Sequence, residues 1–120
     1  MPKEPSERTG WRSVLQHMSA SKNRTDILTI YRQKYGTQKQ LIVAAKEMAD
    51  LQKCILNMAI GRQSDSGSFI EKIADAELVL LNLKLLIPKD KIDNLEQIID
   101  SKVEKLRQEM IDDPNIVERY

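Results

Sequence analysis

Four acidic residues have types and spacings that could place carboxylates together between two helices. Glu47 and Asp50 are three residues apart in one apolar segment, and Glu71 and Asp75 are four apart in the next. Residues three or four apart are neighbours on one face of a helix. Several carboxylates that meet inside a protein need a positive charge beside them, and Mg²⁺ is the usual cation for such hard oxygen ligands. A magnesium site is therefore one interpretation of this spacing.

An ordinary salt-bridged surface would explain the same four acids. Lys46, Lys53 and Lys72 lie in the same two segments, at distances that allow ion pairs along a helix. Glu47 argues against this alternative, because it falls inside the apolar arc of its helix and burial of an unpaired charge is costly. Spacing alone leaves both interpretations open.

Four predicted helices must position these residues. The first begins near residues 23–25 with Asn23 or Thr25 as cap, and it ends at Gly36. The second covers 37–60, with Thr37 and Gln40 in a capping-box pattern and Gly61 after its end. The loop 61–67 separates it from a helix over 68–87, and a fourth helix over 89–111 follows Pro88. No segment alternates like a strand, so the fold class is all-α, a four-helix up-and-down bundle completed by oligomerisation.

The helical wheel predicts which faces are buried. In the second helix the buried stripe comprises Leu41, Ala44, Ala45, Met48, Leu51, Ile55 and Met58. The third helix is apolar on almost all sides, which predicts burial on most sides. One of its arcs nevertheless gathers Glu71, Lys72, Asp75 and Asn82, while Glu77 and Lys84 form an ordinary solvent stripe opposite. If the second and third helices form an antiparallel hairpin, Glu47 and Asp50 face Glu71 and Asp75.

Charge and composition limit the class of protein. Residues 1–40 hold eight basic and three acidic residues, whereas residues 41–120 hold eleven and fifteen. We expect residues 1–22 to form a weakly ordered basic arm and residues 23–120 a single helical domain. The basic residues of the last helix alternate with acids, which does not favour nucleic-acid binding. A single cysteine, a polar N-terminus and no long apolar run favour a cytoplasmic protein without a membrane span.

The segment from Tyr35 to Ile87 resembles the MazG-like all-α nucleoside triphosphate pyrophosphohydrolases, above all the short phage and bacterial members. That family carries E-x-x-E on one helix and E-x-x-D on the next. The resemblance implies that Glu47, Asp50 and Asp75 bind Mg²⁺, or Mn²⁺ in its place, and that Glu71 acts as an auxiliary ligand or base. Asn82 matches an Asn that many members keep. The implied reaction converts a nucleoside triphosphate into a monophosphate and pyrophosphate.

The sequence departs from the family pattern at one acid. Lys72 stands where the third acid belongs, and an ammonium group there repels Mg²⁺. Three outcomes follow: Glu71 replaces the lost ligand, the site binds metal weakly, or Lys72 takes the place of the cation in an inactive protein that binds a nucleotide or a protein partner. Arg62, in the loop after the second helix, is a candidate phosphate contact. A chain this small, with a third helix that is apolar on almost all sides, also predicts a homodimer or homotetramer.

Overall fold

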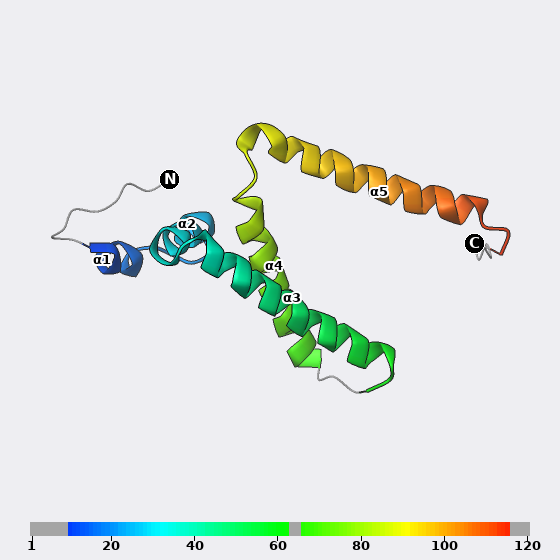
Figure 1. Cartoon of the computed structure of the whole chain (residues 1–120), viewed down its shortest axis with the longest axis horizontal. Coiled ribbons are helices and arrows are strands. Elements are labelled where there is room, and N and C mark those ends of the chain that lie inside the picture. Colours follow the sequence, from blue (N-terminus) through cyan, green and yellow to red (C-terminus); the bar gives the residue numbers. More distant parts are fainter. Residues whose placement is uncertain (1–9, 63–65, 116–120) are drawn as a thin grey trace. The chain divides into compact units, whose positions relative to one another are not determined.

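In the computed structural model the described residues are 10–62 and 66–115, and within these ranges every regular element is a helix. The elements are α1 (Gly10–Gln16), α2 (Arg24–Tyr35), α3 (Thr37–Ala59), α4 (Ser66–Lys84), the short 3-10 helix η1 (Lys89–Lys91) and α5 (Ile92–Asp112) (Figure 1). The all-α prediction is confirmed. The predicted helix ends agree with these bounds to within three residues.

The chain divides into two compact units, residues 1–86 and residues 87–120. The first unit contains α1 to α4, and the second contains η1 and α5. None of the helices in the described ranges combines the length and the apolar character that crossing a bilayer requires.

The α3–α4 hairpin is the centre of the first unit. The two helices pack along each other and run in opposite directions, as predicted, and α2 contacts both of them (Figure 1). Cys54 of α3 and Ala76 and Val79 of α4 are buried, with Ile30 of α2. Arg32 of α2 donates from Nη1 to the carbonyl oxygen of Leu85 at 3.4 Å, which ties α2 to the end of α4.

Two glycines end helices as predicted. Gly36 has φ 89° and donates its N–H to Arg32 O at 2.8 Å, and Gly61 has φ 78°. Glycine adopts this positive φ without the steric cost that a side chain adds.

The prediction of Asn23 as the N-cap residue of α2 is confirmed, whereas the predicted capping box of α3 is wrong. The side chain of Asn23 donates to Ser19 O at 3.1 Å and makes no capping hydrogen bond to α2. The N-cap of α3 is Gly36, and Gln40 turns its side chain toward α2 and α4. Tertiary hydrogen bonds therefore replace the local capping box at the start of α3.

The buried face of α3 is rotated from the predicted stripe. Gln40, Ala44 and Cys54 are buried and Glu47 and Asp50 are half-buried. Several residues of the predicted stripe are instead exposed, namely Leu41, Ala45, Met48, Ile55 and Met58. The physical reason is that α3 has two apolar arcs, and α4 covers the one that contains the polar side chains.

The outer face of α4 is also less covered than predicted. Ile70 is 69% exposed, Leu78 47% and Leu80 43%, so this helix is not buried on most sides. Its inward arc follows the prediction for Lys72, Asp75 and Asn82, which are half-buried, but not for Glu71, which is exposed. In the second unit the apolar residues of α5 from Ile98 onward are exposed.

Candidate functional site

A cavity of about 260 Å³ lies among α2, α3 and α4. Its polar lining comes from Glu47 and Gln40 on α3 and from Asp75 and Asn82 on α4. Tyr31 adds an aromatic ring, and the remaining wall is apolar, formed by Leu28, Val43, Leu78 and Val79. Three of the residues predicted for the site thus share one cavity: Glu47, Asp75 and Asn82.

Gln40 fixes the inner end of this cavity. Its side chain is 5% exposed, and its Nε2 donates to Asn82 Oδ1 at 3.3 Å and to Leu28 O at 3.4 Å. One amide therefore joins all three helices. Because Asn82 accepts with its Oδ1, its Nδ2 is the donor group that it can offer to a ligand.

The charge of the lining is negative. Glu47 and Asp75 are both carboxylates, and no lysine or arginine is among the residues that line the cavity. A phosphate group entering here would meet two like charges unless a cation came with it. The cavity therefore suits a ligand that carries a cation, or a cation alone.

Asp50 and Lys72 form a separate contact. Lys72 Nζ lies 3.9 Å from Asp50 Oδ2, and the two side chains are 33% and 40% exposed. At this exposure an ion pair contributes only about 0–1 kcal/mol to stability. Asp50 thus has an ammonium partner, and neither residue lines the cavity.

One antiparallel register relates all these residues. The three pairs are Gln40 with Asn82, Glu47 with Asp75, and Asp50 with Lys72. From one pair to the next, the residue number rises on α3 by as much as it falls on α4. The hairpin thus carries three successive polar pairs: amide with amide, acid with acid, and acid with lysine. Figure 1 shows α3 and α4 crossing each other.

Two other predicted site residues lie elsewhere. Glu71 is exposed and does not line the cavity. Its side chain would therefore have to move to replace the metal ligand that is lost at position 72. Arg62 is exposed in the turn after α3, where its N–H donates to Asn57 O at 2.9 Å. Neither is placed beside Glu47 or Asp75.

Sequence reasoning missed Gln40, Leu28 and Tyr31 as members of the site. A signal for Gln40 existed, because it precedes Glu47 by seven residues just as Asp75 precedes Asn82 by seven. Seven residues are close to two helical turns, which places both amides on the same faces as the acids.

The donor set suits a magnesium ion that arrives with phosphate. Mg²⁺ is usually held by one or two carboxylates together with substrate phosphates and water. Glu47 and Asp75 supply two carboxylates on one cavity. Within residues 10–62 and 66–115 no group of three acidic, histidine or cysteine side chains is arranged to hold an ion on its own.

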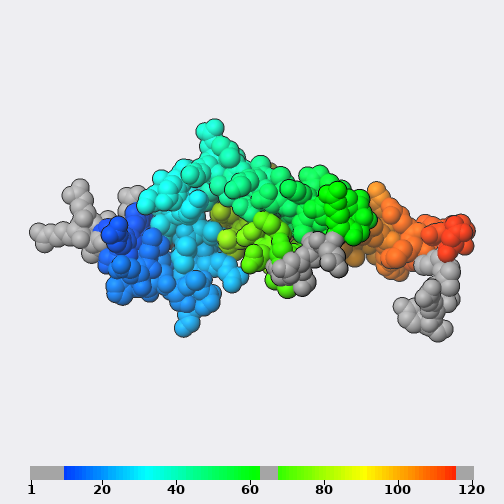
Figure 2. Space-filling view, turned by 90° about the horizontal axis from the view of Figure 1, so that it is seen from below, coloured from blue at the N-terminus to red at the C-terminus, as the bar shows by residue number. Residues whose placement is uncertain are grey.

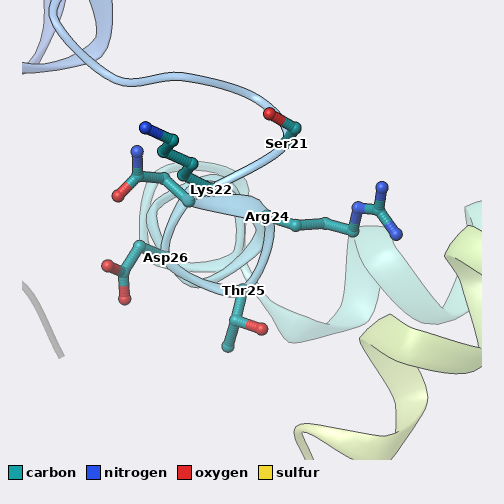
Figure 3. A pocket seen from close by; sticks show the side chains of 6 residues that line it. Ser21, Lys22, Arg24, Thr25 and Asp26 are labelled. Carbon is teal, nitrogen blue, oxygen red and sulfur yellow. The ribbon is translucent and has the colours of Figure 1, made fainter.

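A second hollow, of about 340 Å³, surrounds the start of α2 and is lined by the consecutive residues 21–26. Figure 3 shows that its labelled side chains diverge, with Arg24 on one side and Lys22 and Asp26 on the other. A single short segment with diverging side chains does not converge on a ligand.

Comparison of the chain with protein-family models, characterised proteins and solved structures gives no match. The MazG-like resemblance therefore remains a prediction that depends on the residues themselves.

Proposed function

We propose that this chain is a magnesium-dependent nucleoside triphosphate pyrophosphohydrolase of the MazG-like kind, with a weakened metal site. The observation that supports it is the cavity in which Glu47 and Asp75 face a common space with no basic residue beside them. Such a lining favours a nucleotide that brings its own divalent cation.

In this proposal each residue has a defined task. Glu47 and Asp75 supply the metal ligands, and Asn82, oriented by Gln40, donates an N–H to the bound nucleotide. Tyr31 and the apolar wall exclude water from one side and offer a surface for the base or sugar. The cavity is smaller than the roughly 300–1,000 Å³ of drug-sized ligand sites, so it accommodates part of a nucleotide.

Bound Mg²⁺ would supply charge neutralisation at the phosphates and activate a water molecule. The proposed hydrolysis would add a water molecule across the bond between the α- and β-phosphates and release a monophosphate and pyrophosphate. Lys72 has the opposite effect, because its ammonium group pairs with Asp50, the residue predicted as a third ligand. We therefore expect weaker metal binding than in a site with a full set of acids.

The Asp50–Lys72 pair also supports a second candidate function. Here Lys72 takes the place of the cation, and the protein binds a nucleotide or a protein partner without hydrolysis. The two candidates differ in metal dependence. Binding in the second would persist without Mg²⁺, and it would weaken when Lys72 is changed to Met.

The test is pyrophosphate release from a panel of ribo- and deoxynucleoside triphosphates, with Mg²⁺ and then Mn²⁺. Release that depends on metal and names a preferred nucleotide is the expected result. No release from any nucleotide, with metal-independent nucleotide binding, would instead support the second candidate. The cytoplasmic location and a homodimer or homotetramer are further parts of this proposal.

A further inference from the structure

The outer face of α4 carries a second apolar stripe that the other described helices of the first unit leave partly exposed. Its members recur at spacings of four, four, three and four: Ile70, Ala74, Leu78, Leu81 and Leu85. Ile70 and Leu78 are 69% and 47% exposed, and Ala74 is also exposed. The Leu85 N–H bonds to Leu81 O at 3.3 Å, so helical winding continues to the last member.

A hollow of about 680 Å³ follows this stripe. Ala74, Leu78, Leu80 and Leu81 line it, with Glu77 and Lys84 from the same helix and Arg24 from the start of α2. Figure 2 shows part of α4, in yellow-green, open to solvent beside α2 and α3. A hollow lined by both apolar and charged side chains has the mixed composition of a protein interaction surface.

The two charges that α4 places on this face, Glu77 and Lys84, are self-complementary. Glu77 and Lys84 are both exposed and lie seven residues apart on one flank of the stripe. When two copies of a helix pack antiparallel about a two-fold axis, residues on the same flank face each other. Glu77 of one copy then faces Lys84 of the other, and the reverse pair forms by symmetry.

The same register also aligns the apolar residues. If Leu78 of one copy lies at the same level along the helix axis as Leu81 of the other, then Ala74 of the first copy lies at the level of Leu85 of the second. In an antiparallel pair with these core layers, Glu77 precedes Leu78 in one copy and Lys84 precedes Leu85 in the other. These two flanking residues then face each other. A single register thus satisfies both the apolar and the charged residues.

We propose that α4 forms an antiparallel pair with α4 of a second copy of this chain, with Leu78 packed against Leu81 and Glu77 paired with Lys84 across the two-fold axis. This inference does not rest on the proposed nucleotide chemistry. It specifies the surface and the register of self-association.

The first test is sedimentation of the full chain over a range of concentrations. The wild-type chain should form a species of twice its 13.8 kDa mass. Glu77→Lys and Lys84→Glu should each weaken the dimer at least about tenfold, because like charges then face each other twice. The double variant Glu77→Lys/Lys84→Glu should restore dimerisation to near wild type.

Lys53→Glu is the matched control, because it makes the same change of charge at an exposed lysine of α3. It should leave the dimer unchanged. A chain that stays monomeric at all concentrations, or a dimer that is insensitive to both charge reversals, would overturn the proposal.

A second test reports the register directly. A mixture of Glu77→Cys and Lys84→Cys chains should be joined between the two variants by a short thiol-specific crosslinker, because these flanking positions of helices about 8–10 Å apart are too distant for a direct disulfide. Either variant alone should be joined far less, since positions 77 of the two copies are offset by a further seven residues, about 10 Å along the axis. The wild-type chain, whose cysteine Cys54 is buried, is the control. Linkage of each variant only to itself would contradict the register.

Discussion

Two neighbouring pairs on the α3–α4 hairpin differ in how their charge is balanced. Glu47 and Asp75 line one cavity with no basic residue in its wall, whereas Asp50 lies 3.9 Å from Lys72. The two pairs are only three residues apart on each helix and share one antiparallel register. In the proposed function the first pair binds an external cation, whereas in the second pair the Lys72 ammonium group is the cation.

The neighbours of the two pairs differ as well. The cavity pair lies beside Gln40 and Asn82, and α2 contributes Leu28 and Tyr31 to the same wall. The Asp50–Lys72 pair is one-third or more exposed on both sides. All four side chains are half-buried, but only Asp50 has a positive charge beside it, because the cavity lining around Glu47 and Asp75 contains no lysine or arginine. A bound ion therefore matters most at Glu47 and Asp75.

The largest expected effect is the loss of Asp75. We predict that Asp75→Asn lowers metal-dependent pyrophosphate release about 100-fold or more, because it removes one of two carboxylates from the cavity while it keeps the side-chain shape. The measurement is the initial rate at saturating Mg²⁺. Asp100→Asn, at an exposed acid of α5, is the control and should leave the rate unchanged.

If Asp75→Asn retained the wild-type rate, the contrast between the two pairs would have no functional meaning.

The next effect concerns stability. Gln40→Leu should lower the free energy of unfolding by about 1–3 kcal/mol, because it leaves Asn82 Oδ1 and Leu28 O without the donor that they share. Urea unfolding of the two proteins measures this difference. Gln38→Leu changes an exposed glutamine of the same helix and should change stability by less than about 0.5 kcal/mol.

Equal loss in the two glutamine variants would show that the buried amide does not hold the cavity end together.

The smallest effect is a gain at the second pair. Lys72→Glu should raise Mg²⁺ affinity about tenfold, because it replaces a repelling ammonium with a carboxylate beside Asp50. Calorimetric titration with Mg²⁺ measures the change, and Lys53→Glu controls for net charge. An unchanged affinity would place position 72 outside any metal site.

The sequence predicted most of the helices, because their ends depend on local chemistry. Gly36 and Gly61 take positive φ values at the ends of α2 and α3, as their residue type favours. Pro88 likewise separates α4 from η1. The capping box at Thr37 and Gln40 failed because a tertiary hydrogen bond network used Gln40 instead.

The site was predicted only in part, for a physical reason. Helical periodicity placed Glu47, Asp75 and Asn82 on the faces that meet, but it did not give the axial register between the helices. That register decides that Asp50 meets Lys72, and not a second acid. Periodicity also could not tell which of two apolar arcs of α3 would be covered, so Leu41, Met48 and Ile55 were wrongly expected to be buried.

The most direct test of the central claim is where a divalent cation binds in the presence of a nucleotide. Mn²⁺ broadens nuclear magnetic resonance signals close to it, and the side-chain amides of Gln40 and Asn82 report on the cavity. With a triphosphate that cannot be cleaved between its α- and β-phosphates, we predict that both amide signals broaden at low Mn²⁺ and that they recover in Asp75→Asn. Sharp signals from both amides, with broadening elsewhere in the chain or nowhere, would contradict the assignment of Glu47 and Asp75 as the metal and nucleotide site.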